Sequence, residues 1–375
     1  MRKSSNFFKI SLIYFISLTL FVGIRIVFQL GFLRGMNEHL QDIISTLLIQ
    51  VIIMFLVPFL LYMLVYRKKP KETFSDVGFK KISSRAIWIS VLIGIIAFFL
   101  NIVVSSVFNG IINGLGYESG SGSGSADYSV LSFFINVLCV SVLPAFCEEF
   151  LHRGILMRGM FNSISVKHAL IISSICFGLM HLNIVQVFYA SILGLLIGFV
   201  SIVGKSIWPA IIIHFVNNFI NVYLSFAQNN GWVFGDFYQT LNNFITTNWI
   251  FALLLIIISI LAMLALLCKL IMDLLKITSF DSFKNVIFNL KKSLNKDIVN
   301  YSSGENVTEQ HYIEDIEPII LENVYEPKSN TELFLQDIYP KERLYLKDKI
   351  FMIATMFLGI FITVSTFIWG ILWLQ

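Results

Sequence analysis

Residues 147–153 read Cys-Glu-Glu-Phe-Leu-His-Arg and follow an apolar stretch that begins near residue 129. Two adjacent carboxylates at membrane depth are costly unless they are paired or hydrated, so ionisable groups there are functional candidates. Two more polar groups interrupt later apolar segments: residues 177–181 read Phe-Gly-Leu-Met-His, and residues 214–218 read His-Phe-Val-Asn-Asn. Acid, base and amide side chains on three separate segments predict one hydrolytic site inside a membrane.

The composition of the chain supports a membrane protein. Of its 375 residues, 57% are hydrophobic and 13% are charged, whereas soluble domains carry about 25% charged residues. Apolar runs of about 20 residues are long enough to span a hydrocarbon core of about 30 Å as helices. We therefore expect an all-α, polytopic membrane helix bundle with about nine transmembrane helices, at residues 7–33, 41–66, 85–115, 129–147, 168–183, 184–203, 207–226, 246–276 and 349–373.

The distribution of Lys and Arg predicts the orientation of the bundle. Basic residues precede the first span, fill the loop 67–81, and follow the fourth and sixth spans, whereas residues 116–128 and 228–243 lack them. Because cytoplasmic loops are enriched in Lys and Arg, we expect a cytoplasmic N-terminus and a multi-pass protein of a cell membrane, the plasma membrane of a bacterium. This topology places Glu148 and Glu149 near the cytoplasmic end of the fourth helix. No basic stripe with interleaved aromatic residues points to nucleic acid.

Helical spacing assigns different roles to the two acids. Glu149 and Arg153 are four residues apart and share a helix face, with the acid first, which favours an ion pair. Glu148 points about 100° away and remains able to accept a proton from water as a general base. His152 could pair with Glu148, but we expect it at the membrane interface.

The later motifs supply the other groups that peptide hydrolysis needs. Phe177 lies one helical turn before His181, so its ring can pack beneath the imidazole and orient it. His214 and Asn218 also lie one turn apart, and an imidazole beside a carboxamide can donate hydrogen bonds to an oxyanion.

Two further chemistries stay open at this point. Glu148, His181 and His214 form a set of two histidines and one glutamate, which is one arrangement for catalytic zinc, so a divalent metal is one option and its requirement is unknown. Cys147 offers a thiol nucleophile, although a small buried apolar role is favoured for it.

The three motifs in this order resemble the type II CAAX prenyl endopeptidase and bacteriocin-processing family of intramembrane proteases, also called the CPBP or Abi family. The matches are Glu148-Glu149-x-x-x-Arg153, Phe177-x-x-x-His181 and His214-x-x-x-Asn218. The resemblance implies that Glu148 and His181 activate water, that His214 and Asn218 stabilise the oxyanion, and that Glu149 and Arg153 support the site. It also extends to residues 206–214 and to the run 194–198, whose two glycines would allow close helix packing.

The resemblance organises the chain into five regions. We expect a two-helix membrane region with a basic cytoplasmic loop (1–84), a CPBP-like catalytic core (85–226), an additional transmembrane helix (227–276), a cytoplasmic polar segment (277–348) and a C-terminal transmembrane helix (349–375). The expected activity is cleavage of a membrane-associated, lipidated or precursor peptide near the cytoplasmic face.

Two other functions remain as alternatives. The first is a non-catalytic immunity factor or scaffold of the same family, which would bind a peptide or a membrane protein without cleaving it. The second is an ion-coupled transporter, which would also explain buried Glu and His. A transporter predicts an internal repeat, and the sequence contains no convincing one.

Overall fold

The computed structural model describes residues 5–117, 127–301 and 344–373, and every described element is a helix. Its helices are α1 (Asn6–Gln29), α2 (Glu38–Thr46), α3 (Val57–Tyr66), α4 (Pro70–Asp76), α5 (Ser84–Gly114), α6 (Val130–Asn136), α7 (Leu143–Glu149), α8 (Arg158–Met160), α9 (Val166–Leu179), α10 (Ile184–Val203), α11 (Trp208–Asn230), α12 (Phe237–Thr247), α13 (Trp249–Tyr301) and α16 (Leu346–Trp373). Three π-helical segments, η1 (Leu47–Leu56), η2 (Val137–Val142) and η3 (Phe150–Met157), join their neighbours into the continuous runs Glu38–Tyr66 and Val130–Met160.

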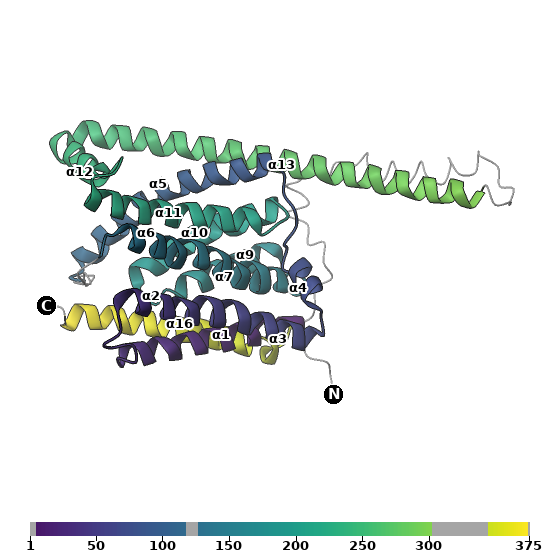
Figure 1. Cartoon of the computed structure of the whole chain (residues 1–375), viewed down its shortest axis with the longest axis horizontal. Helices are drawn as coiled ribbons and strands as arrows, with labels where there is room; N and C mark the ends of the chain where they lie inside the picture. Colours follow the sequence, from purple (N-terminus) through teal and green to yellow (C-terminus); the bar gives the residue numbers. More distant parts are fainter. Residues whose placement is uncertain (1–4, 118–126, 302–343, 374–375) are drawn as a thin grey trace. The chain divides into compact units, whose positions relative to one another are not determined.

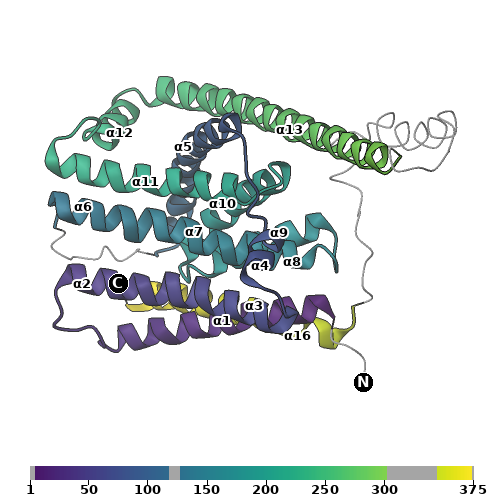
Figure 2. The ribbon, with the colours of Figure 1, turned by 45° about the vertical axis from the view of Figure 1, so that its right-hand side comes forward.

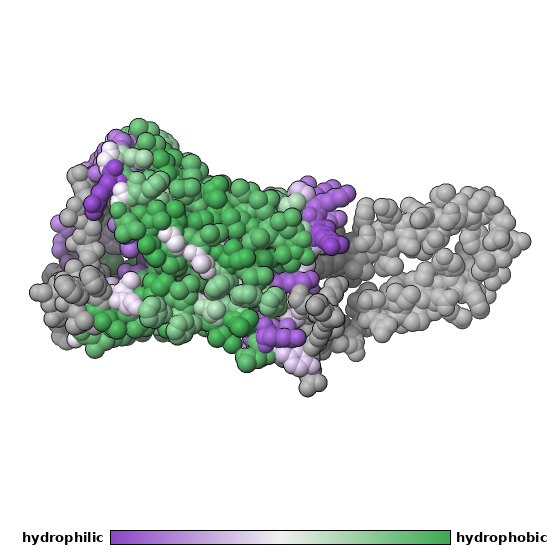
Figure 3. All heavy atoms as spheres, turned by 90° about the horizontal axis from the view of Figure 1, so that it is seen from below, coloured by the Kyte–Doolittle hydropathy of each residue, from purple (hydrophilic) through white to green (hydrophobic). Residues whose placement is uncertain are grey.

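The expected all-α, polytopic membrane architecture is confirmed. Within the described residues, eight helices are long and apolar enough to cross a membrane. Large apolar side chains such as Leu64, Trp88 and Phe357 are exposed on the outside. Figure 3 shows one face of the protein, where a broad apolar surface lies between polar ends. A bilayer is the solvent that such a surface requires.

The chain divides into two compact units, and the site lies wholly within the first. The first unit comprises residues 1–271 and 339–375, and the second comprises residues 272–338. In the first unit, α1, α3 and α16 lie side by side as one layer (Figures 1 and 2), in agreement with the contacts of α1 with both other helices.

The fifth expected span, at 168–183, is shorter than predicted. It forms the 14-residue helix α9, which rises roughly 21 Å at 1.5 Å per residue and is too short for a hydrocarbon core of about 30 Å. α9 packs antiparallel against α10, with Gly178 near Ser191 and Leu170 near Gly198. The two helices form a hairpin that starts and finishes at the same end of the bundle. The direction predicted for each later helix is therefore unchanged.

Polar contacts define the two ends of the bundle. At one end, hereafter the basic end, the Asn6 side chain donates to the Gly159 carbonyl (2.7 Å) and the Ile207 N–H donates to the Gly78 carbonyl (2.9 Å). Lys205 also lies there, and burial together with the nearby charge of Lys80 lowers its pKa.

The opposite end, hereafter the far end, gathers the remaining turns. His39 lies 3.0 Å from Asp127, and the Asn230 amide donates to the Tyr128 carbonyl at 3.0 Å. The long helices of the first unit therefore run between the basic end and the far end, and a described residue on one of them can be placed nearer to one end or the other.

Candidate active site

The two acids lie inside a helix, not at its end. The sequence predicts that the fourth span finishes at residue 147, but the helical run continues to Met160, and Glu148 lies roughly 18 Å before that end. Polar residues 152 and 153 resemble an interface in the sequence, yet both side chains have 0% exposure. The predicted helix end is therefore wrong, because these polar side chains are paired with other groups of the protein and not with water.

Glu149 is the centre of a buried charge network. Its carboxylate lies 3.2 Å from Arg153 Nε and accepts hydrogen bonds from Arg153 Nη1 (3.2 Å) and His214 Nδ1 (2.8 Å). Arg153 also donates from Nη2 to the Gly194 carbonyl at 2.9 Å. Since Glu149 and Arg153 both have 0% exposure, each buried charge is stabilised by the opposite charge of the other side chain.

The ring of Phe177 separates the cationic and imidazole side chains of the site. The Arg153 guanidinium lies over its face, 4.4 Å from the centroid. The imidazoles of His152, His181 and His214 meet the ring edge-to-face, with centroids 5.1, 5.4 and 5.6 Å away. Phe177 thus contacts His181, as its spacing predicts, and it also holds two other histidines in fixed orientations.

His181 lies in the turn between α9 and α10 and not within a continuous helix. Its Nδ1 lies 3.0 Å from the Phe177 carbonyl, which can only accept, so Nδ1 carries a proton and Nε2 is an acceptor in the neutral ring. Irregular backbone at membrane depth is tolerated where it lines a polar cavity and its groups are paired. Here Asn183 caps α10, and Thr366 of α16 donates to the Leu182 carbonyl at 3.1 Å.

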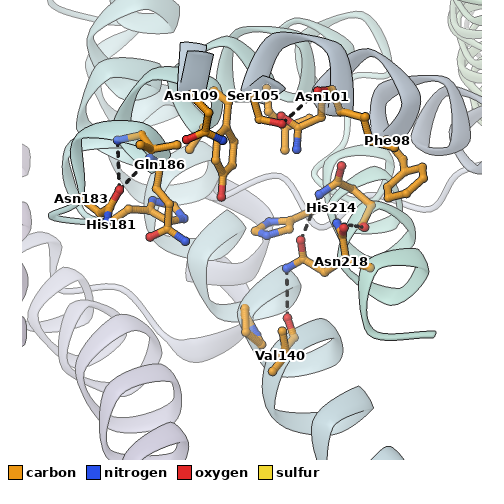
Figure 4. A pocket seen from close by; sticks show the side chains of 18 of the residues that line it. Phe98, Asn101, Ser105, Asn109, Val140, His181, Asn183, Gln186, His214 and Asn218 are labelled. Atoms are coloured by element: carbon orange, nitrogen blue, oxygen red, sulfur yellow. Dashed lines mark hydrogen bonds between the residues drawn. The ribbon is translucent and has the colours of Figure 1, made fainter. Parts of the chain in front are cut away.

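Asn218 stands one turn after His214 on α11. Its Nδ2 donates to the Val140 carbonyl (3.0 Å), and its Oδ1 accepts from Asn217 Nδ2 (3.1 Å). These two bonds fix the rotation of the amide, and one Nδ2 proton remains for a further acceptor. Figure 4 shows His214 and Asn218 together on one wall of the cavity.

Glu148 has a partner that the sequence did not reveal. Gln50, on η1 of the second span, donates from Nε2 to Glu148 Oε1 at 2.8 Å and is 8% exposed. The signal was present as a single amide in the apolar run Leu47–Leu56, because a polar residue at membrane depth needs a partner. The resemblance to the protease family begins only at residue 85, so it did not direct attention to Gln50.

His152 is buried, which corrects the interfacial position expected for it. Its Nδ1 lies 2.8 Å from the Glu148 backbone carbonyl, and its Nε2 lies 3.0 Å from the Tyr14 hydroxyl. Tyr14, on α1, also donates to the Cys176 carbonyl at 3.1 Å. His152 therefore binds the backbone of Glu148 and leaves the carboxylate to Gln50.

A cavity of about 1240 Å³ unites the predicted residues. Its lining includes the four proposed catalytic side chains and Phe177, namely Glu148, Phe177, His181, His214 and Asn218. The Cys147 side chain is 2% exposed and does not line the cavity, so the thiol alternative has no access to a substrate there.

The predicted metal set is not assembled in the described part of the chain. No three His, Cys, Asp or Glu side chains among the described residues are grouped so that they could hold a metal ion. His214 directs Nδ1 at Glu149, and His181 directs Nδ1 at a carbonyl. As placed, Glu148, His181 and His214 therefore do not fit a shared zinc ion.

Comparison with known proteins agrees with the motifs. Over 200 residues, the chain is 24% identical to the Bacillus subtilis (strain 168) protein named "Putative membrane peptidase YdiL", which covers 52% of this chain and 79% of that relative. No solved structure matches. Residues 130–220 match the model of the family described as "Type II CAAX prenyl endopeptidase Rce1-like", a narrower region than the expected 85–226. The matched residues 130–220 contain all four proposed catalytic side chains, so the region of this chain that is similar to the Rce1-like family includes the candidate site.

Proposed function

We propose that this protein is an intramembrane endopeptidase of a cell membrane that hydrolyses a peptide bond in a membrane-associated peptide. The observation that carries the proposal is the convergence of Glu148, His181, His214 and Asn218 on one cavity. The family match and the named relative support peptidase activity in general. The residue roles below, the substrate and the location are our own proposals.

Glu148 and His181 are the groups that activate water. The Gln50 bond holds Oε1 of Glu148, and Oε2 is then available to accept a proton from a water molecule in the cavity. His181 has its acceptor at Nε2 and can hold the same water by a hydrogen bond. Removal of such a general base typically lowers a rate by about 10²–10⁴-fold.

His214 and Asn218 stabilise the oxyanion that forms when water attacks the carbonyl carbon. A neutral His214 that donates from Nδ1 to Glu149 has only an acceptor at Nε2, so oxyanion binding through Nε2 requires the doubly protonated ring. In that state the two carboxylates, Glu148 and Glu149, carry two negative charges. These charges are balanced by the positive charges of Arg153 and His214. A neutral cluster is the favourable state at membrane depth.

The protons balance over the reaction. Glu148 takes one proton from the attacking water, the new C–O bond forms, and the carbonyl electrons move to the oxygen held by His214 and Asn218. When the C–N bond breaks, Glu148 returns its proton to the departing amine, and the product carboxyl forms. No step is assigned to a metal ion, because the described residues do not form a donor set.

The position of Glu148 along its helix bears on where cleavage would occur. The sequence predicts a bond near the cytoplasmic face, and Glu148 lies roughly 18 Å before the Met160 end of the run Val130–Met160. We therefore propose cleavage within the bilayer, at a segment whose backbone is unwound. The substrate class is a membrane-associated peptide, and the cavity supplies the water that such a reaction needs.

The test compares wild type with Glu148→Gln by mass spectrometry of membrane peptides from cells that express each protein. The substitution keeps the shape of the side chain and removes its basicity, so products present with wild type should be lost. Glu38→Gln, at an exposed acid on α2 that does not line the cavity, is the matched control and should behave as wild type. Identical peptides from wild type and Glu148→Gln, with both proteins folded, would favour the scaffold alternative.

A further inference from the structure

The catalytic cavity extends in one direction only. From the level of His214 and Glu148 it reaches Arg25 near the end of α1, Asn109 near the end of α5, and Asn242 on α12. These three residues all lie toward the far end. Arg25 and Asn242 are exposed, whereas Phe177 at the deep end of the cavity is buried.

The basic end is closed off from this cavity. A separate cavity of about 440 Å³ lies at the basic end, lined among others by Lys68, Lys80 and Arg158, and the two cavities share no lining residue. Between their levels lie the buried pair Glu149–Arg153 and core residues such as Phe150 and Leu151, all with 0% exposure. Water and substrate therefore reach Glu148 from the far end.

The positive-inside rule places the far end on the outer side of the membrane. The loop 67–81 and Lys205 belong to the basic end, whereas the described far-end turns at 115–117 and 231–236 contain no Lys or Arg. Arg34, in the turn after α1, is the exception. Because Lys and Arg are enriched in cytoplasmic loops, the basic end is cytoplasmic and the cavity opens outward.

The lining of the cavity indicates the chemistry of its occupant. Carboxamides are unusually frequent there. Besides Gln50 on η1 and Asn218 on α11, they include Asn101 and Asn109 (α5), Gln186 (α10), Asn221 (α11) and Asn242 (α12). Arg25 and Glu148 are the charged lining residues besides the histidines. Figure 4 shows amides from α5, from α11 and from the start of α10 around the same space.

Such a wall suits an extended polypeptide and does not suit an isoprenoid. Each carboxamide offers both donors and an acceptor, so it can pair with either the N–H or the C=O of an unwound backbone. Those backbone groups are costly at membrane depth when they are unpaired. An apolar lipid chain would instead leave the amides desolvated without partners.

We infer that the cavity is an outward-facing chamber that receives an extended, uncharged, non-lipidated polypeptide segment from the outer side of the membrane. This inference rests on the proposed peptidase function for the fate of the segment, but the route of access is independent of catalysis.

The route is tested by labelling engineered cysteines in the full-length protein. Ser106→Cys places a thiol at an exposed position of the chamber, and Ser75→Cys places one at an exposed position of the basic-end cavity. The two substitutions are chemically identical and nearly isosteric. Cys139 lines the chamber and Cys268 is exposed, so both are replaced by Ser in the background.

A membrane-impermeant, negatively charged maleimide is added to spheroplasts before or after permeabilisation. Ser106→Cys should be labelled in intact spheroplasts, and Ser75→Cys only after permeabilisation. Labelling of Ser106→Cys only after permeabilisation, or not at all, would overturn the outward route. Adding Glu148→Gln to the background should leave this pattern unchanged, so loss of proteolysis and loss of the access route are separate results.

The occupant is tested by protection of the same thiol. Uncharged ten-residue peptides of mixed Ala, Ser, Thr and Gly sequence should slow the labelling of Ser106→Cys in permeabilised membranes, whereas farnesol should not. Protection by farnesol, or no protection by the peptides, would overturn the assignment of the occupant. Ser75→Cys should be insensitive to both probes.

Discussion

Replacing Arg153 by Met should destabilise the protein strongly. The substitution keeps much of the side-chain volume and removes the charge that faces Glu149, which has 0% exposure. Breaking one side of a buried ion pair costs about 3–5 kcal/mol, because the remaining charge is left uncompensated. The Gly194 carbonyl also loses its donor at 2.9 Å, and Phe177 loses the cation 4.4 Å from its centroid. His214 still faces Glu149, so about 3–5 kcal/mol is the expected loss in total.

A double-mutant cycle separates the charge effect from the loss of packing. The free energy of unfolding is measured by titration with SDS in mixed micelles for wild type, Arg153→Met, Glu149→Gln and the double variant. Since each single variant leaves one buried charge alone, the double variant should lose less than the sum of the two, by about 2 kcal/mol. Additive losses would mean that the two side chains do not depend on each other, and the network centred on Glu149 would be refuted.

Two further predictions concern the hydrogen bond of Gln50 and the helix packing at Gly178. Gln50→Leu should lower the rate of peptide cleavage by about 10- to 100-fold. The reason is that a hydrogen bond to a charged group contributes about 1.5–3 kcal/mol, and this bond holds the proposed base, Glu148. An unchanged rate would show that Gln50 is not part of the site. Gly178→Ala should destabilise by roughly 1–3 kcal/mol in the SDS titration, since an added Cβ would lie 2.5 Å from the Val187 carbonyl and meet Ser191 Oγ. Gly23→Ala, where nothing lies within 4 Å of an added Cβ, is the matched control, and equal effects at both positions would contradict the packing of the α9–α10 hairpin.

The sequence predicts the fold class and the spacing of the motifs because both depend on local periodicity. Long apolar runs must become helices in a bilayer, and residues four apart must share a helix face. The Glu149–Arg153 contact and the Phe177–His181 contact need no more information than that. Their convergence on one cavity depends on tertiary packing, and only the order of the motifs in the family indicates it.

Residues 152 and 153 show why the end of the fourth span was predicted wrongly. Hydropathy treats each side chain as if it faced the same solvent, so His and Arg appear as an interface. In the fold, Tyr14 of α1 pairs with His152, and the Gly194 carbonyl of α10 accepts from Arg153 in addition to Glu149. A polar group with a partner on another helix can lie at any depth, and the sequence does not show such partners.

The sequence predicts the break before residue 184, but it places His181 inside the preceding helix. Residues 181–183 are His, Leu and Asn, with no Gly or Pro to indicate that α9 ends at Leu179. Leu182 takes a left-handed conformation, with φ of 56°, which is uncommon for a branched apolar residue. Tertiary bonds compensate this local cost, since Thr366 pairs the Leu182 carbonyl and Asn183 caps α10.

Helix α10 carries none of the four proposed catalytic side chains, yet the site depends on it. The Gly194 carbonyl receives Arg153 Nη2, and a Cβ at Gly194 would lie 3.1 Å from that nitrogen, so glycine permits the close approach. Arg153 is then held by the Glu149 carboxylate, the Gly194 carbonyl and the Phe177 ring. Glu149 Oε1 still accepts from His214, and the orientation of His214 thereby depends on the position of α10. A substitution at Gly194 should therefore change the proposed oxyanion site through Arg153 and Glu149, although Gly194 itself carries no reactive group.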